Sequence, residues 1–115
     1  MVVKRFEVYL VNLDPTIGAE IRKTRPGIIV SEDAIGILPL RIIVPITDWK
    51  ARYEVAPWMV QIMPDPQNGL SKPSAADAFQ IRSISSERFL ARIGKVTTDE
   101  LQQLLEAVQI VIGLG

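Results

Sequence analysis

The chain has 115 residues, with 13 Lys and Arg balanced by 13 Asp and Glu, so its formal net charge is zero. This length suits one domain, 1–115, and the charge balance excludes a strongly basic nucleic-acid binder, so any nucleic-acid partner would need a local patch. The chain contains no Cys and no His, which excludes disulfides, Cys-rich zinc sites, thiolate nucleophiles and an imidazole base. The scattered acids show no metal-ligand spacing, and we predict no metal site and no cofactor.

No segment approaches the roughly 20 apolar residues that a membrane-spanning helix requires. The N-terminus carries Glu7 in place of an uninterrupted signal core, and we expect a cytoplasmic protein without a membrane partner. Hydrophobic residues make up 48% of the chain, a high fraction for a small domain, whose surface is proportionally large. This excess favours an apolar surface that meets a partner, with a tight β core as the alternative.

The predicted elements are a series of short strands and then one helix. The first strand alternates in polarity and stops at Asp14-Pro15, and the others are β-branched or aromatic runs bounded by turn residues. Pro45 predicts a bulge or strand end within the third strand, because proline cannot donate to a ladder. The predicted strands are residues 6–13, 27–30, 41–46, 58–63, 76–84 and 92–96, with a hairpin or short excursion at 35–39 and a helical turn at 85–91.

The C-terminal segment has helical periodicity. Thr97 and Glu100 have the Thr-x-x-Glu spacing of a capping box, and Gly113 is a stop signal. The apolar residues that recur at helical spacing between them are Leu101, Leu104, Leu105, Val108, Val111 and Ile112. Strands followed by one amphipathic helix predict a mainly β (α+β) fold, in which a small, strongly bent barrel of five to seven strands carries the helix.

The loop from Gly18 to Ser31 collects more chemically useful side chains than any other segment. In a chain without His or Cys, RNA cleavage is an accessible reaction, because the ribose 2′-hydroxyl supplies the nucleophile and the protein orients it, moves protons and stabilises the phosphorane. The planar fork of Arg25 matches two phosphate oxygens, and Arg22 and Lys23 add charge nearby. The alternative for this basic cluster is a solvated turn.

Further side chains extend the hypothesis. A carboxylate base starts from a pKa near 4.3 and an arginine from one above about 12, so Glu20 is the favoured base. Its alternative is a surface ion pair worth under about 1 kcal/mol. Thr47 would donate to the phosphate if its strand neighbours the loop's strand, and its alternative is a turn hydrogen bond. Trp49, Trp58 and Phe79 could stack on bases, with core or interface packing as the alternative.

Several short motifs recur in a specific order along nearly the whole chain. They are VYLVNLDP at 8–15, GAE at 18–20, RP at 25–26, VPIT at 44–47, GLSKPS at 69–74 and QIRSI at 80–84, followed by the final helix. This arrangement resembles the MazF/PemK (Kid) toxins of bacterial toxin–antitoxin systems. The resemblance implies a small SH3-like barrel that forms a homodimer and is blocked by a cognate antitoxin. It also implies metal-independent cleavage of single-stranded RNA, often at short sequences, leaving a 2′,3′-cyclic phosphate and a 5′-hydroxyl.

The resemblance places the family's essential Arg on Arg25, its essential Thr on Thr47 and its loop Glu on Glu20. Two departures are visible. Phe79 stands where better-studied members often have an acid, with Asp77 nearby, and the first loop lacks the His that some members use. The residues predicted to bind RNA are Arg22, Lys23, Thr24, Asp77, Gln80 and Arg82.

Two alternatives to an endoribonuclease toxin remain. One is a non-enzymatic toxin of the same fold that inhibits a protein target such as DNA gyrase. The gyrase-poisoning relatives use a Trp near the C-terminus, whereas this chain ends in Ile-Gly-Leu-Gly at 112–115. The other is an inactive module kept for its antitoxin contact. The apolar tail from Val108 to Leu114 predicts a homodimer, and we expect the antitoxin to be a partly disordered acidic peptide that folds across it.

Overall fold

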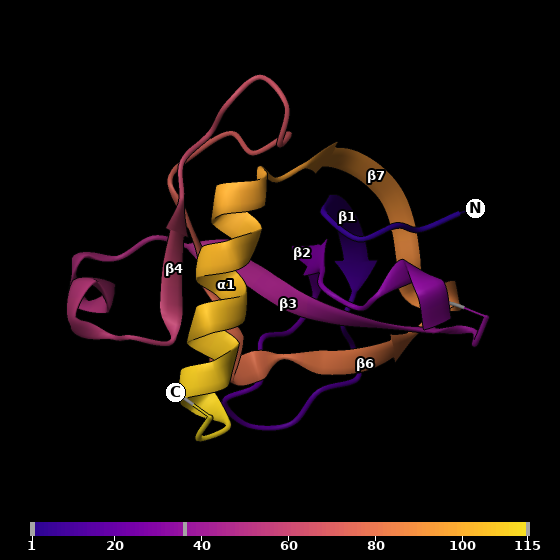
Figure 1. The fold of residues 1–115 in the computed structure, drawn as a ribbon, viewed down its shortest axis with the longest axis horizontal. Coiled ribbons are helices and arrows are strands. Elements are labelled where there is room, and N and C mark those ends of the chain that lie inside the picture. The colour runs from indigo at the N-terminus through magenta and orange to yellow at the C-terminus, as the bar shows by residue number, and fades with distance from the viewer. Residues whose placement is uncertain (1, 36, 115) are drawn as a thin grey trace.

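The structure, a computed structural model, describes residues 2–35 and 37–114. Over this range the chain forms seven antiparallel strands, four short 3₁₀ helices and one α-helix (Figure 1). The strands are β1 (Glu7–Asn12), β2 (Thr24–Ile29), β3 (Leu40–Asp48), β4 (Met59–Ile62), β5 (Ser74–Asp77), β6 (Arg82–Ser85) and β7 (Phe89–Lys95). The helices are η1 (Asp33–Ile35), η2 (Ala51–Val55), η3 (Ala78–Gln80), η4 (Ser86–Arg88) and α1 (Thr98–Val111). Gly36, inside the predicted excursion at 35–39, lies outside the described residues.

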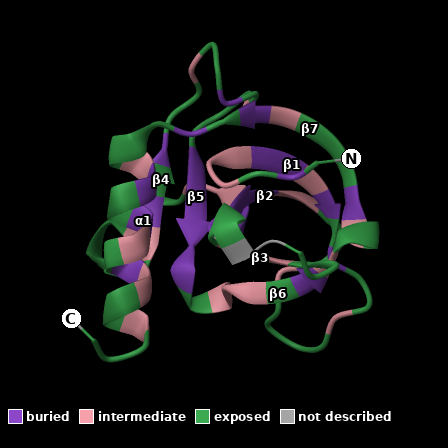
Figure 2. Cartoon of the chain, turned by 45° about the vertical axis from the view of Figure 1, so that its right-hand side comes forward, coloured by how far each residue is buried: buried purple, intermediate pink, exposed green. Residues whose placement is uncertain are grey.

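The strands follow the order β4-β5-β3-β2-β1-β7, and β6 pairs with β3 as well. The strand β3 is therefore the centre of the sheet, since it pairs with β2, β5 and β6. The sheet curves strongly on itself (Figure 2), but its path ends at β4 and β7, so it is bent without being closed. The predicted mainly β fold of five to seven strands with a C-terminal helix is confirmed.

The strand β3 runs without interruption through Pro45, where the sequence predicted a bulge or strand end. The carbonyl of Ile42 accepts a hydrogen bond from the Val30 amide at 3.0 Å, so Ile42 faces β2 and Pro45, three residues on, faces the opposite edge. On that edge β6 pairs with β3 up to Ile43, and β5 pairs with it from Ile46 onward. Pro45 lies between the two partner strands, so its lack of an N–H group removes no hydrogen bond between strands.

The predicted strand 76–84 is two strands, β5 and β6, separated by η3. The Asp77 carboxylate accepts a hydrogen bond from the Phe79 amide at 3.1 Å, a local bond that favours a turn over a continued ladder. The turn carries the chain from one end of β3 to the other. The strand β5 pairs with the C-terminal end of β3, and β6 pairs with its N-terminal part. The last strand, β7, also begins earlier than predicted, at Phe89, directly after η4.

Two groups of buried side chains lie on opposite faces of the sheet. The first includes Val8, Ile28 and Ile46, and α1 covers part of it with residues such as Leu104. The second, which includes Tyr9, lies inside the bend. Figure 2 shows buried residues along one side of α1 and throughout β5. Among the described residues, no helix combines the length and apolarity that crossing a membrane requires.

The helix α1 begins with the predicted capping box. The Thr97 hydroxyl accepts from the Glu100 amide at 3.1 Å, and the Glu100 carboxylate accepts from the Thr97 amide at 2.9 Å. We expect Thr97→Ala to lower the free energy of unfolding in urea by about 1 kcal/mol, because an amide of the first turn loses its partner. Thr98→Ala, one residue further on, is the matched control and should not lower it. An equal loss in both variants would contradict a role for the cap.

Candidate active site

The strands β2 and β3 bring Arg25 and Thr47 opposite each other. They pair through Gly27 and Pro45, and continuing the antiparallel register by two residues sets Arg25 across from Thr47. Arg25 lies two residues from Gly27, and Thr47 lies two residues from Pro45, so both side chains belong to the same face of the sheet. The condition that the sequence analysis attached to Thr47, two neighbouring strands, is met.

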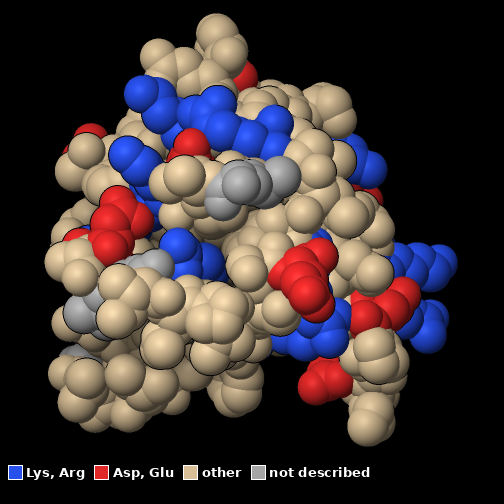
Figure 3. All heavy atoms as spheres, turned by 90° about the vertical axis from the view of Figure 1, so that its right-hand side faces the viewer, with Lys and Arg blue, Asp and Glu red and all other residues tan. Residues whose placement is uncertain are grey.

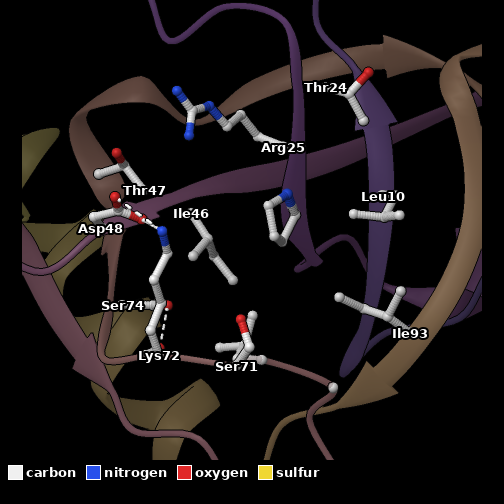
Figure 4. A pocket seen from close by; sticks show the side chains of 13 residues that line it. Leu10, Thr24, Arg25, Ile46, Thr47, Asp48, Ser71, Lys72, Ser74 and Ile93 are labelled. Atoms are coloured by element: carbon white, nitrogen blue, oxygen red, sulfur yellow. Dashed lines mark hydrogen bonds and ion pairs between the residues drawn. The ribbon is translucent and has the colours of Figure 1, made fainter.

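Arg25 and Thr47 line a cavity of about 320 Å³, here called the central cavity. Figure 4 shows the Arg25 side chain extending toward Thr47, away from Leu10 and Ile93. Its apolar lining comes from Leu10, Pro26, Ile46, Leu70 and Ile93. Its polar lining comes from Thr24, Arg25, Thr47, Asp48, Ser71, Lys72 and Ser74. The central cavity therefore has an apolar floor on one side and cationic and hydroxyl groups on the other.

The guanidinium of Arg25 holds a buried donor without a partner. Its Nε is shielded from solvent and makes no hydrogen bond. In the part of the chain that the structure describes, no carboxylate forms an ion pair with Arg25. A buried donor that is left unpaired costs roughly 1–3 kcal/mol. The terminal nitrogens of the same guanidinium fork suit the oxygens of a phosphate.

Two charged residues of the central cavity were missed by the sequence analysis. The Nζ of Lys72 lies 3.1 Å from Oδ1 of Asp48 (Figure 4). Both side chains are more than half exposed, at 63% and 51%, so water screens the pair and Lys72 remains available to a phosphate. Two signals were present in the sequence: Asp48 directly follows Thr47, and Lys72 lies within the GLSKPS motif.

The loop between β4 and β5 is packed tightly against β7. The side chain of Asn68 is fully buried, where its Oδ1 accepts from the Leu70 amide at 3.0 Å and its Nδ2 donates to the Met63 carbonyl at 2.8 Å. The next residue, Gly69, has a φ of +71°, and a Cβ at this position would lie 2.1 Å from the carbonyl oxygen of Ile93. This packing fixes the segment that carries the polar residues 71 and 72 into the central cavity.

Glu20 lies in a second cavity of about 450 Å³, here called the lateral cavity. Its Oε1 accepts from the Ile17 amide at 2.6 Å. The side chain of Gln80 holds this part of the loop, because its Oε1 accepts from the Ile21 amide at 2.5 Å and its Nε2 donates to the Ala19 carbonyl at 3.2 Å. Gln80 therefore binds the main chain on both sides of Glu20 and fixes the position of its peptide.

The structure distributes the six predicted RNA-binding residues over four environments. Thr24 lines the central cavity, and Gln80 and Arg82 line the lateral one. Arg22 and Lys23 are exposed on the loop and line neither of these two cavities. Asp77, the sixth of them, is buried.

Over residues 4–112 the chain matches the family described as PemK-like, MazF-like toxin of type II toxin–antitoxin system. It is 36% identical to the endoribonuclease MazF9 of Mycobacterium tuberculosis, across 97% of this chain and 98% of that protein. The chain belongs to this toxin family. The toxin is also 30% identical to the endoribonuclease EndoA of Bacillus subtilis, across 99% of this chain and 97% of that protein. The resemblance stated from the motifs is confirmed.

Solved structures share the fold of this toxin. MazF from Deinococcus radiodurans superposes with a TM-score of 0.81, at 22% identity and 98% coverage of both chains. An endoribonuclease in complex with its cognate antitoxin, from a mycobacterial species, superposes with a TM-score of 0.78, at 20% identity, covering 99% of this chain and 98% of that one. At these identities the likeness establishes the bent sheet with its C-terminal helix as the family fold.

Charge on the toxin is mixed in sign. On the face drawn in Figure 3, Lys and Arg side chains form a group in the upper part, with Asp and Glu among them and both signs below. The equal numbers of acids and bases give the toxin a formal net charge of zero. An anionic ligand would therefore be attracted by individual cavity residues such as Arg25 and Lys72, and not by a large net charge.

Asp77 of the toxin is only 5% exposed. Burial raises the pKa of its carboxyl, and hydrogen bonds from Phe79 and Gln80 act in the opposite direction. Because the folded state binds the proton more tightly, the contribution of this group to stability is present at low pH and falls as the pH rises through the raised pKa. Its carboxylate serves the backbone of η3, as the hydrogen bond to the Phe79 amide shows.

We expect Asp77→Asn to keep the acceptor for the Phe79 amide while removing the cost of ionisation. The free energy of unfolding of the variant minus that of the wild type should therefore be larger at pH 7 than at about pH 3, where the carboxyl of both states is mostly protonated. Urea titrations at the two pH values measure this difference, and other titrating groups cancel between the two proteins. A difference that shrinks toward neutral pH would contradict the assignment.

Proposed function

We propose that this toxin, an endoribonuclease like the relatives that match nearly its whole length, cleaves single-stranded RNA in the central cavity. The observation that carries the proposal is the guanidinium of Arg25, which has no ion-pair partner among the described residues and lines the central cavity on the strand opposite Thr47. A phosphate in the cavity would accept from the terminal nitrogens of this guanidinium, and the Thr47 hydroxyl and the Lys72 ammonium would contact the same group. The relatives named as endoribonucleases support the reaction class.

The proposed reaction uses the nucleophile of the substrate. The ribose 2′-hydroxyl loses its proton to a base of the protein as its oxygen attacks the neighbouring phosphorus, the bond from phosphorus to the 5′-oxygen breaks, and the 5′-oxygen takes up a proton from water. The products are a 2′,3′-cyclic phosphate and a 5′-hydroxyl. Arg25 stabilises the charge of the phosphorane, and Thr47 donates to one of its oxygens. Because water is not the nucleophile, the reaction requires no metal-bound hydroxide.

Incubation of the purified toxin with a mixed single-stranded RNA in EDTA tests this proposal. We expect fragments with 2′,3′-cyclic phosphate ends, and sequencing of the ends defines any preferred sequence. Intact RNA after a prolonged incubation, or cleavage that begins only when a divalent metal is added, would contradict it. A double-stranded RNA of the same sequence is the matched substrate control.

The proposal assigns the proton-accepting role to Glu20, which would have to act from the lateral cavity, beside the central cavity at Pro45 and Thr47. Asp48 is a carboxylate that lines the central cavity, so it provides a matched comparison. We expect Glu20→Gln to lower the single-turnover cleavage rate by about 10²-fold or more, the usual range for loss of a general base, and Asp48→Asn to change it by a few-fold only. The opposite order of the two effects would transfer the role to Asp48.

We further propose that the toxin acts in the cytoplasm as a homodimer and is inhibited by a cognate antitoxin. The exposed apolar side chains of Ile110, Ile112 and Leu114 near the C-terminus support association. The mycobacterial relative in complex with its antitoxin supports inhibition by a partner protein, and the basic residues Arg22 and Lys23 suit an acidic peptide. Sedimentation at micromolar concentration that yields only a 12.8 kDa species would contradict the dimer.

A further inference from the structure

In the lateral cavity, Gln80 holds the loop that carries Glu20. The other residues that line this cavity are not needed for that contact. An apolar wall, a solvent-exposed aromatic ring and a cation meet in a space of about 450 Å³. The apolar wall comes from Ile21, Pro45 and Ile81, the ring from Phe79 and the cation from Arg82. Phe79 is 66% exposed, although side chains of this kind are usually buried.

We propose that the lateral cavity is a nucleobase subsite. It holds a base of the RNA strand next to the phosphate that is cleaved, with the base stacked on the ring of Phe79 and Arg82 in contact with the base edge or its phosphate. This inference rests on the proposed function, because it adds a specificity-determining position to cleavage in the central cavity.

The ring of Phe79 is held in place and still open to solvent. It meets the ring of Trp58 edge to face, with centroids 6.3 Å apart and an angle of 79° between the planes, an arrangement that stabilises aromatic pairs. With this contact in place, the residue as a whole is still 66% exposed. Proteins bind unpaired RNA bases by stacking them on aromatic rings of this kind.

The two cavities adjoin along β3. Pro45, which lines the lateral cavity, lies on the same face of β3 as Thr47, which lines the central cavity. Two residues of extended strand separate them by about 7 Å. A strand of RNA whose phosphate is bound between Arg25 and Thr47 therefore has an adjoining base within reach of the lateral cavity.

The polar groups of the lateral cavity favour RNA over an apolar protein segment. The only hydrogen bond of the Arg82 side chain within the described residues is a long one, 3.4 Å to the Leu13 carbonyl, so most of its donors remain available. The amide of Gln80 is already engaged by the loop backbone. Arg82 is therefore the group that meets the charge of the RNA, and Gln80 shapes the wall of the subsite.

Cleavage of a mixed single-stranded RNA by the wild type and by Phe79→Ala tests the inference. We expect the alanine variant to lose the base preference at one position next to the cut, and to show about a tenfold lower kcat/KM on the preferred sequence, as expected when an aromatic ring is removed from a base stack. The single-turnover rate at saturating RNA should change little. Phe79→Trp should restore both preference and kcat/KM, because it keeps a stacking surface.

Leu90→Ala, on β7, is the matched control, since Leu90 is 53% exposed and lines neither cavity. A single-stranded oligonucleotide of the preferred sequence, with 2′-deoxyribose at the cut, measures affinity without cleavage and should bind Phe79→Ala more weakly. No cleavage by the wild type overturns the proposed function, and this inference with it. Cleavage by Phe79→Ala with unchanged preference and affinity overturns the inference alone. Loss only of dimer or antitoxin binding also overturns it and assigns the surface to a protein partner.

Discussion

Replacing Arg25 with alanine is expected to lower the single-turnover rate of RNA cleavage by about 10²–10³-fold. The reason is the loss of the donors that meet the charge developing on the phosphorane. The free energy of unfolding should not fall, because the Nε of Arg25 is buried without a partner in the free toxin and its removal leaves no acceptor unpaired. Quench assays on the preferred RNA in EDTA, with urea unfolding in parallel, measure the two quantities.

Arg25→Lys separates charge from geometry. Lysine keeps the positive charge but cannot contact two phosphate oxygens with a planar fork, so we expect it to recover only a small part of the lost rate. Leu90→Ala, at an exposed residue that lines neither cavity, is the control for a substitution outside the active site. If Arg25→Ala cleaves RNA at the wild-type rate, Arg25 is not part of the active site. If Arg25→Lys recovers the full rate, Arg25 contributes only its positive charge.

Gly69→Ala is expected to lower the free energy of unfolding by about 3 kcal/mol or more and to impair cleavage at the same time. A Cβ at Gly69 would lie 2.1 Å from the carbonyl oxygen of Ile93, so the backbone of β7 or of the loop must move. The φ of +71° adds the strain of a left-handed conformation. Because Leu70, Ser71 and Lys72 follow directly, this movement displaces one side of the central cavity.

Gly18→Ala provides the comparison for this effect. Gly18 also has a positive φ, +58°, but a Cβ there would meet nothing within 4 Å. It should therefore show the conformational strain alone, about 1–2 kcal/mol. Thermal and urea unfolding of both variants measure the difference. Equal destabilisation by the two substitutions would show that the contact between the loop and β7 is not tightly packed.

Local sequence patterns predicted both ends of the C-terminal helix. Which strands pair with each other in the sheet was harder to predict. The capping box of Thr97 and the stop at Gly113 depend on neighbours within a few residues, and both are present. The continuity of β3 through Pro45 depends on which strands lie on each edge, which no local pattern contains. The break at Asp77 had a local signal, a side chain able to cap a turn, but the β-like run 76–84 obscured it.

In the candidate site, too, local sequence predicted some positions, and contacts between distant segments determined the others. Arg25 and Thr47 were paired from their order in the chain, and the register of β2 and β3 sets them opposite each other. Glu20 was grouped with them because it is close in sequence, but the path of the loop carries it into the lateral cavity. Lys72 enters the central cavity through the tightly packed loop before β5, whose shape depends on contacts with Ile93 that are distant in sequence.

The contact of Gln80 with the first loop has a consequence for how such toxins diversify. Gln80 binds the main-chain atoms of Ala19 and Ile21 and not their side chains. Substitutions at these two positions therefore leave the anchor intact, except proline at position 21, which has no amide hydrogen to donate. The loop can therefore change its chemical character while the peptide between these two residues keeps its place, without a new fold for the loop.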